Sequence, residues 1–221
     1  MAISKSETPR ILITAGPTWE PLDPVRGILN RSSGKMGLAL AQACHKRDLA
    51  VRVLLGPVQQ DIKVKISSIA DVSGYQTSRE LEVLLQEHWP RHDILFMAAA
   101  VADLRPSAVS PTKLPREHMT LEFEPVPDLL RNLADQNPEH GTRIGFALEE
   151  PSQLIERARK KMSTKRCHAI AANPLGTIES DQASGAWVTP LHSQPLGFSD
   201  KEEYAEVLLE QTLELHALRG G

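Results

Sequence analysis

The stretch RILITAGP, residues 10–17, is a short apolar run, rich in β-branched residues, that ends in a Gly-Pro pair. A run of this kind predicts a buried strand followed by a turn. Similar apolar runs recur at residues 51–58, 93–103, 143–148 and 168–173. Their apolar residues are nearly continuous rather than alternating, which is typical of strands in a sheet that is covered on both faces.

Amphipathic segments separate these apolar runs. Apolar side chains recur at helical spacing in residues 35–48 and again in residues 78–88, where Ser78 is the expected helix cap. Further helices are expected to begin near Pro127 and to cover residues 201–217. Strands that alternate with helices predict parallel pairing through crossover connections.

The alternation predicts a Rossmann-like α/β fold, a mostly parallel sheet with helices on both faces, in a single domain of residues 1–221. Residues 104–118 interrupt the pattern with three prolines among mostly polar residues, and we expect an irregular flap there. Residues 119–123 alternate like a strand with one solvated face, and residues 185–190 are expected to form a final edge strand.

Composition excludes several classes of function. The formal net charge of -3 gives no electrostatic reason to expect nucleic acid or an anionic membrane as a partner. Two cysteines and scattered histidines argue against a disulfide framework and against a structural zinc site. The first residues are polar and no apolar stretch is long enough for a membrane span, so we expect a cytoplasmic protein without a signal peptide.

The loop NRSSGKMG, residues 30–37, stands where a helix is about to begin. It matches neither GxxxxGK[ST] nor GxGxxG. Two serines and a glycine backbone at a helix N-terminus can bind a phosphate or a carboxylate, and a plain helix cap by Ser33 is an equal alternative. Open parallel sheets bind ligands beyond the carboxyl ends of their strands, where Gly16–Thr18, Ala99–Asp103 and Asn173 are expected to converge.

An oxidoreductase is one alternative, because SSGKMGLALAQA resembles the start of short-chain dehydrogenases. Against it, a long segment separates the first strand from the glycine loop, and no Tyr-x-x-x-Lys sequence is present. The second strand ends in Gly56-Pro57 rather than in the acidic residue that holds an NAD ribose. An NAD(P)-binding enzyme is therefore disfavoured.

A longer set of motifs resembles a different family. ILITAGPTWEPLDPVRGILNRSSGKMGLALAQA, MAAAVADLRP, Lys113, PDLL, GFALE and KKMSTK…AIAAN follow one another as in the phosphopantothenoylcysteine synthetase domain. That domain is the ligase half of the bacterial bifunctional coenzyme A biosynthesis flavoprotein. The resemblance covers roughly residues 10–181. The flavin-binding decarboxylase half has no counterpart in this sequence, so we expect a stand-alone synthetase without FMN.

The resemblance implies a ligase that joins 4'-phosphopantothenate to cysteine through an acyl-nucleotide. CTP is favoured over ATP as the nucleotide, with Mg²⁺ as cofactor and a homodimer as the assembly. Asn30 would act on the acyl-phosphate intermediate, and Lys113 on the flap would stabilise charge at the α-phosphate. Asp103 would bind the nucleotide directly or through Mg²⁺.

The resemblance also implies the binding positions. The nucleotide would contact Met97, Ala98, Ala99, Asp103, Lys113, Pro127, Asp128, Leu129, Leu130, Phe146, Lys161 and Lys165. The acyl substrate would contact Asn30, Arg31, Ser32, Ser33, Gly34 and Lys35. Lys161 and Lys165 belong to a basic run in residues 157–166, which on charge alone is typical of a solvated helix face.

Some positions depart from the family pattern. Lys113 is followed by Leu-Pro-Arg where the family has a basic run, and Pro125-Val126 replaces Lys-Asn. Pro174 replaces an aspartate, and residues 178–181 replace a Phe-x-Ser-Asp motif. These changes keep a third hypothesis open, a nucleotide-binding homologue without catalysis.

Overall fold

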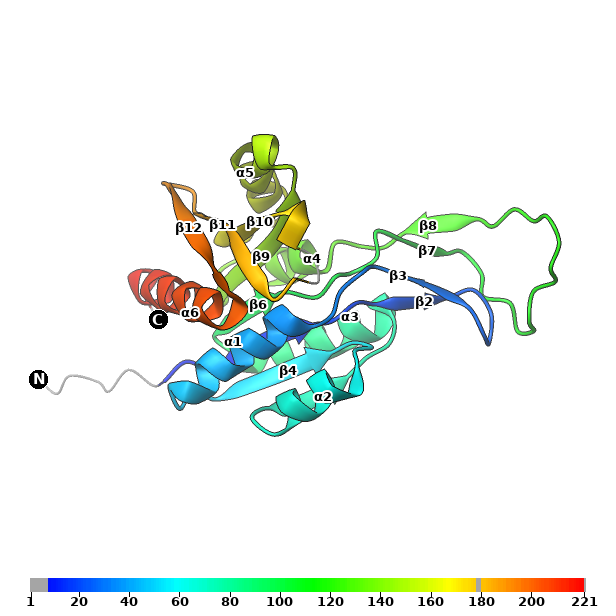
Figure 1. Ribbon diagram of the computed structural model, residues 1–221, viewed down its shortest axis with the longest axis horizontal. Coiled ribbons are helices and arrows are strands. Elements are labelled where there is room, and N and C mark those ends of the chain that lie inside the picture. Colours follow the sequence, from blue (N-terminus) through cyan, green and yellow to red (C-terminus); the bar gives the residue numbers. More distant parts are fainter. Residues whose placement is uncertain (1–7, 178–179, 221) are drawn as a thin grey trace, which may run out of the picture.

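The computed structural model describes residues 8–177 and 180–220, so Ile178 and Glu179 of the altered motif lie outside the described residues (Figure 1). The strands are β1 Ile11–Ala15, β2 Trp19–Pro21, β3 Gly27–Leu29, β4 Val51–Leu55, β5 Asp71–Gly74, β6 Ile94–Met97, β7 Leu104–Pro106, β8 Phe123–Pro125, β9 Thr142–Glu149, β10 Ala169–Pro174, β11 Gln182–Val188 and β12 Ser193–Asp200. The helices are α1 Lys35–Lys46, α2 Gln60–Ser67, α3 Ser78–His88, α4 Leu129–Gln136, α5 Leu154–Lys165 and α6 Lys201–Leu218, with short 3₁₀ turns at Trp89–Arg91, Pro151–Gln153 and Leu175–Thr177.

Eight strands form one sheet in the order β12-β11-β10-β9-β6-β1-β4-β5. The six strands from β10 to β5 pair in parallel, and β11 and β12 add an antiparallel edge. The chain runs from β1 outward through β4 to β5, and then crosses to β6 on the other side of β1. A crevice opens at such a switch point, because the connections leave the carboxyl ends of neighbouring strands in opposite directions. The predicted α/β fold is confirmed.

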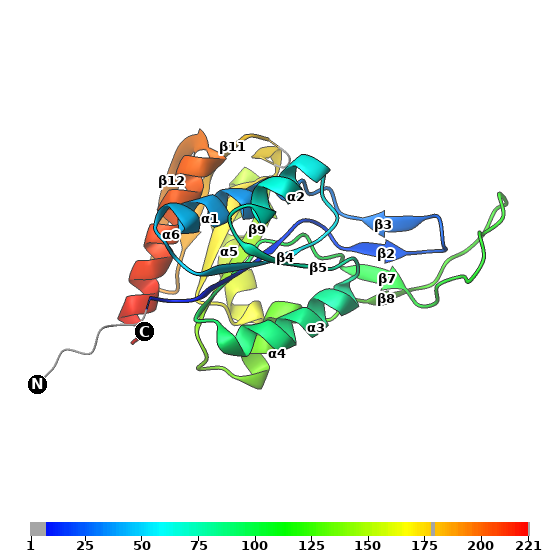
Figure 2. The same ribbon diagram turned by 90° about the horizontal axis from the view of Figure 1, so that it is seen from below.

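Helices cover both faces of the sheet, and Figure 2 shows α1, α2 and α6 on one side and α3 and α4 on the other. Successive residues of a strand point to opposite faces. Ile11 and Ile13 of β1 accordingly pack in one core, with residues of α1, α2 and α6. Leu12 packs in the second core, with residues of α3, α4 and α5. This double burial explains why the strand sequences are apolar without alternation.

Two hairpins project from the sheet side by side, and we call them together the arm (residues 19–29 and 104–125) (Figures 1 and 2). The first hairpin pairs β2 with β3, and the second pairs β7 with β8. The irregular flap predicted for residues 104–118 therefore needs a correction, because its first three residues form a strand. The prolines prevent pairing only in the distal loop.

Three local predictions are also corrected. Residues 119–123 do not form a strand; only Phe123 enters β8. Residues 185–190 lie in and after β11, which is an inner strand because β12 pairs with its outer edge. The cap of α3 is Thr77, which accepts the Glu80 N–H while the Glu80 carboxylate accepts the Thr77 N–H, in a capping box.

The length and hydropathy of the helices also bear on membrane association. Across residues 8–177 and 180–220, none of the helices combines the length and the apolar character that crossing a bilayer requires.

Candidate active site

A cavity of about 570 Å³ opens at the carboxyl ends of β6, β9 and β10, beside the switch point of the sheet. Seven separate segments and the first residue of α6 contribute to its wall. The predicted residues that line it are Asn30, Arg31, Ser32, Ser33, Gly34, Lys35, Met97, Ala98, Ala99, Asp103, Pro127, Asp128, Leu129, Leu130, Phe146, Lys161 and Lys165. The fold thus brings together residues that lie up to 135 positions apart.

The loop before α1 forms one wall of the cavity. Gly34 occupies the cap position in the left-handed region, with φ of 76°, and no side chain caps the helix. The alternative of a plain cap by Ser33 is therefore wrong, although the Ser33 hydroxyl accepts a long hydrogen bond of 3.4 Å from the Lys35 N–H. An uncapped first turn keeps backbone N–H groups available to an anionic ligand.

Residues 97–103 form another part of the cavity wall. Strand β1 and the chain after it support this segment: the Thr14 hydroxyl accepts from the Ala99 N–H at 3.1 Å, and the Thr18 hydroxyl accepts from the Ala102 N–H at 3.0 Å. Gly16–Thr18 therefore supports the wall instead of lining the cavity, which corrects its expected place. The alanines present little more than backbone to a ligand.

Asn30 and Asp103 lie on segments that hydrogen bonds join. The Asn30 amide donates to the Val101 carbonyl at 2.9 Å. The backbone carbonyl of Asp103 accepts from the Val126 N–H at 2.9 Å, which links the wall to the start of α4. Both side chains are exposed on the cavity wall.

Lys161 and Lys165 project from α5 and each meets a carboxylate. Lys161 pairs with Glu149 at 2.7 Å, and Lys165 pairs with Asp128 at 2.7 Å. Burial alone would raise the pKa of Glu149, but hydrogen bonds from Lys161 and Arg157 outweigh it and hold that pKa below its usual value. The basic run is therefore divided, because these two lysines line the cavity while most of the run does not.

Two further lysines, Lys35 and Lys201, line the cavity, and of these only Lys35 was predicted. Lys35 forms an ion pair with Asp181 at 2.6 Å, and Lys201, the first residue of α6, lines the same cavity. Burial and the charge of Lys35 lower the pKa of Lys201. No local signal marks Lys201, because it reaches the site only when α6 packs against α1. Further unpredicted lining residues are Met36, Gly37, Ala100, Val101, Ala102, Val126, Gly145, Ala147, Leu148, Asn173, Thr177 and Ala183.

Lys113 is the one predicted site residue that does not line the cavity. It lies on the distal loop of the arm and is exposed. Across the described part of the chain, no three His, Cys, Asp or Glu side chains come together as metal ligands. Mg²⁺ commonly binds one or two carboxylates together with substrate phosphates, so Asp103 suits a magnesium ion that arrives with a nucleotide.

The fold and the cavity define an α/β protein of the doubly wound class, which binds its ligand beyond the carboxyl ends of the strands. The chain belongs to the family described as the DNA/pantothenate metabolism flavoprotein C-terminal domain, whose sequence pattern matches residues 6–215. Family membership confirms the resemblance that the motifs indicate.

Curated relatives of this chain are named as coenzyme A biosynthesis proteins. The coenzyme A biosynthesis bifunctional protein CoaBC of Vibrio cholerae is 37% identical over 202 residues, which are 86% of this chain and 49% of that protein. CoaBC of Bacillus subtilis is 36% identical over 172 residues, 76% of this chain and 41% of that protein. The chain thus spans about half the length of the curated relatives it matches.

Solved structures share the fold. The C-terminal domain of a CoaBC protein superposes with a TM-score of 0.78 at 28% identity, covering 95% of this chain and 96% of that one. A Cab2 mutant, solved in complex with phosphopantothenate-cysteine, gives 0.76 at 18% identity, covering 96% and 87%. At that identity the second likeness concerns the fold alone.

Proposed function

We propose that this chain is a phosphopantothenate–cysteine ligase that activates its acyl substrate with CTP. One observation carries the proposal: seventeen residues implied by the motifs, from segments far apart in sequence, line one cavity at the switch point. Family membership and relatives named for coenzyme A biosynthesis support the same reaction. The motif loop resembles the bacterial form, which favours CTP over ATP.

The proposed chemistry has two steps. A carboxylate oxygen of 4'-phosphopantothenate bonds to the α-phosphorus of CTP while the bond to the β-phosphate breaks and pyrophosphate leaves. The amine of cysteine then attacks the acyl carbon, CMP leaves, and the amine loses a proton. Both steps develop negative charge on oxygen and need no covalent protein group, so positioned donors and cations supply most of the catalysis.

The cavity offers groups for each role. The Asn30 amide can donate to the acyl oxygen, and the first turn of α1 can bind an anion through its N–H groups. Lys161 and Lys165 can neutralise the triphosphate once it replaces their carboxylate partners. Magnesium supplies further charge neutralisation when bound, with Asp103 as its protein ligand.

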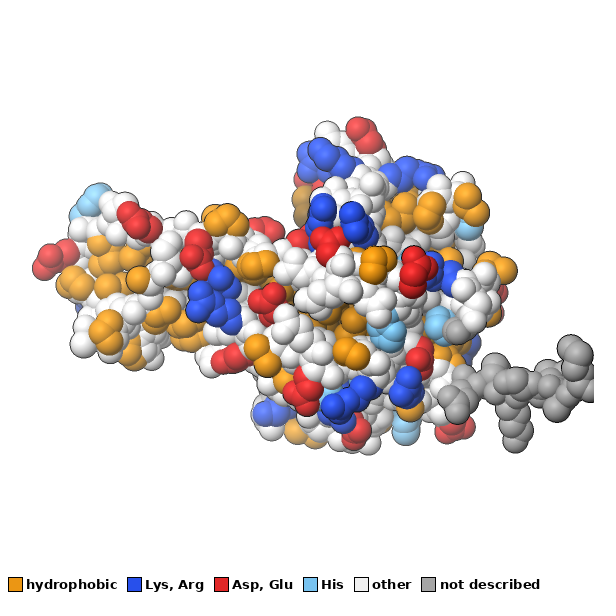
Figure 3. All heavy atoms as spheres, turned by 180° about the vertical axis from the view of Figure 1, so that it is seen from behind, with side chains coloured by type: hydrophobic (Ala, Val, Ile, Leu, Met, Phe, Trp, Pro, Cys, Tyr) orange, Lys and Arg blue, Asp and Glu red, His pale blue; other side chains and the backbone are white. Residues whose placement is uncertain are grey.

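Lys113 acts from a partner subunit in this proposal. It is exposed on the arm, away from the cavity of its own chain. The arm also carries much apolar surface, which Figure 3 shows on the projecting part of the molecule. Its exposed large hydrophobic residues are Val25, Ile28, Leu29, Leu104, Val109, Met119, Leu121 and Phe123. Apolar surface of this extent favours association, and a second copy would bring its arm to the cavity.

The first test is an assay of pyrophosphate release with Mg²⁺, cysteine, 4'-phosphopantothenate and each nucleoside triphosphate in turn. CTP should support turnover best. Lys113→Gln should lower kcat at least about 100-fold, because it removes charge stabilisation in the transition state. Lys160→Gln is the matched control, since Lys160 is an exposed lysine of α5 that does not line the cavity.

Each alternative has its own outcome. CTP binding by calorimetry without pyrophosphate release from any nucleotide would favour a non-catalytic homologue, for which the altered residues after Lys113 are the motive. Enhanced NADPH fluorescence in the presence of the protein would favour an oxidoreductase. Equal rates for wild type and Lys113→Gln would contradict the role of that lysine.

A further inference from the structure

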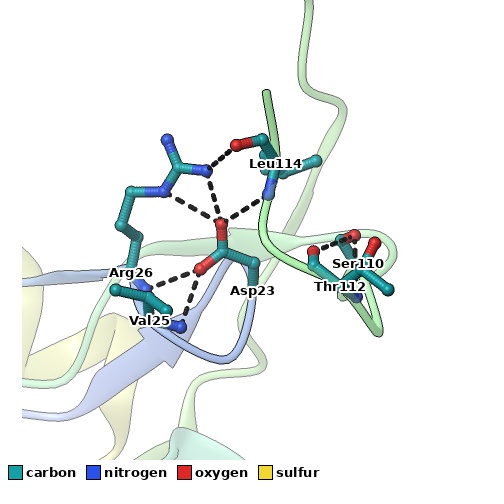
Figure 4. A network of polar contacts seen from close by, with 6 residues as sticks. All are labelled: Asp23, Val25, Arg26, Ser110, Thr112 and Leu114. Carbon is teal, nitrogen blue, oxygen red and sulfur yellow. Dashed lines mark hydrogen bonds and ion pairs between the residues drawn. The ribbon is translucent and has the colours of Figure 1, made fainter. Parts of the chain in front are cut away.

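A buried carboxylate lies at the turn of the first hairpin of the arm. Asp23 is 1% exposed although the arm projects from the body of the molecule. Its Oδ1 accepts the N–H groups of Val25 at 2.8 Å and Arg26 at 2.7 Å. Its Oδ2 accepts Arg26 Nε at 2.9 Å and Nη2 at 2.6 Å, and also the Leu114 N–H at 3.0 Å (Figure 4).

The contact with Leu114 differs in kind from the others. Val25 and Arg26 belong to the same turn as Asp23, whereas Leu114 is 91 residues further along the chain. Arg26 Nη2 also donates to the Leu114 carbonyl at 2.7 Å. One acid–base pair therefore holds both the N–H and the C=O of a single residue, and we call this arrangement the clamp (Asp23, Arg26 and the Leu114 backbone).

The Asp23 carboxylate of the clamp is held in its ionised form. Burial alone would raise the pKa of Asp23, but the hydrogen bonds from Leu114, Arg26 and Val25 outweigh it and hold that pKa well below its usual range. The carboxylate therefore stays ionised at any pH at which the enzyme would work. Charge-assisted hydrogen bonds of this kind are shorter and stronger than neutral ones.

The clamp holds the residue next to Lys113. Elsewhere in the distal loop the backbone is anchored more sparsely, by the Ser110 N–H to Leu22 O at 2.9 Å and the Ser107 N–H to Glu122 O at 3.0 Å. The Lys113 side chain forms no hydrogen bond or ion pair with the residues that the structure describes. The clamp therefore acts on Lys113 through the backbone alone, by fixing the peptide that follows its Cα.

We propose that Asp23 is a positioning residue for Lys113. By fixing the Leu114 peptide it reduces the conformations that Lys113 must lose when the arm meets a cavity. Misplacing a charge-stabilising group by about 1 Å can cost about 100-fold in rate. The inference rests on the proposed function, in which Lys113 stabilises charge at the α-phosphate.

A double-mutant cycle tests the coupling. Asp23→Asn keeps the shape of the side chain but removes the charge, and its amide nitrogen is a donor where the clamp needs an acceptor. It should lower kcat at least about tenfold while KM for CTP changes less than about twofold. In the Lys113→Gln background the same substitution should have no further effect, because there is no ammonium group left to position.

A matched control comes from the same arm. Glu124 pairs with Arg105 at 2.7 Å within the second hairpin and has no contact with the clamp. Any effect of Glu124→Gln should multiply with that of Lys113→Gln. Equal kcat losses for Asp23→Asn with and without Lys113 would show a general structural role and overturn the proposal.

Hydrogen–deuterium exchange separates this inference from the proposed reaction. Exchange at residues 110–116 should speed up in Asp23→Asn and not in Glu124→Gln. An inactive wild type with this difference would overturn the ligase and the catalytic use of the clamp, leaving only a structural one. An active wild type in which Asp23→Asn changes neither exchange nor kcat would overturn the clamp alone.

Discussion

His168 illustrates how one buried side chain can make stability depend on pH. It precedes β10, and its Nδ1 accepts the Arg143 backbone N–H at 2.9 Å. Burial, with the charges of Arg143 and Arg219, lowers the pKa of His168 from 6.5 to about 3. The ring is therefore neutral in the folded protein, because a proton on Nδ1 would remove the acceptor.

Acidification should therefore destabilise the folded protein through His168. Between pH 6.5 and about 3 the unfolded chain binds a proton at His168 that the folded chain does not. The free energy of unfolding is therefore undiminished by His168 above pH 6.5, and it decreases as the pH is lowered below 6.5. The slope from this residue reaches about 1.4 kcal/mol per pH unit. His168→Gln should lose that part of the pH dependence in urea denaturation, while His118→Gln, in the exposed loop, should retain it. Identical profiles for His168→Gln and wild type would contradict this account.

At the level of secondary-structure elements, the packing of helix α1 on strand β1 depends on Gly37, where the two lie in close contact. A β-carbon at Gly37 would overlap the Ala15 β-carbon on the strand. A backbone-fixed carbon cannot rotate away, so the helix would have to move. Because residues 30–37 line the cavity, such a shift would also displace the proposed anion site.

Gly37→Ala is therefore expected to destabilise the protein by about 1–3 kcal/mol, even though alanine favours helices. The urea midpoint should fall at constant m-value, and affinity for 4'-phosphopantothenate should fall with it. Gly197→Ala is the control, because a β-carbon there meets nothing within 4 Å. The idea would not survive a Gly37→Ala variant as stable as wild type.

At the scale of the whole molecule, the arm and the cavity lie apart in one chain, so the proposed site needs a second subunit to be complete. Lys113 is exposed on the arm, whereas the other seventeen predicted residues, Asn30 included, line the cavity. The proposed dimer resolves this separation, since each arm would complete the cavity of the other subunit.

Mixing two inactive variants tests the arrangement. Lys113→Gln keeps an intact cavity, and Asn30→Ala keeps an intact arm. After subunit exchange, activity should recover to about a quarter of wild type, because half of the dimers are mixed and each holds one complete site. Asn30→Ala mixed with Lys161→Ala should recover nothing, since both changes lie in the cavity. No recovery in the first mixture would place Lys113 and Asn30 in the same subunit's site.

Local sequence was enough for most of the main elements. The apolar runs at residues 10–15, 143–148 and 168–173 became β1, β9 and β10 because continuous burial on two faces leaves a direct mark on composition. Strand β5 and the hairpin of β2 and β3 escaped prediction. Short and mostly polar or exposed strands leave no such periodic pattern, and their pairing depends on neighbours distant in sequence.

The sequence by itself determined the α/β fold class, the family and the residue types of the candidate site, because motifs and periodicity are properties of contiguous chain. Only the tertiary structure decided that Lys201 joins the cavity, that Lys113 stands outside it, and that Asp23 reaches Leu114. Those relations depend on strand order and on how the hairpins pack side by side. Contacts between residues about a hundred positions apart arise from burial of the whole chain, and no local pattern encodes them.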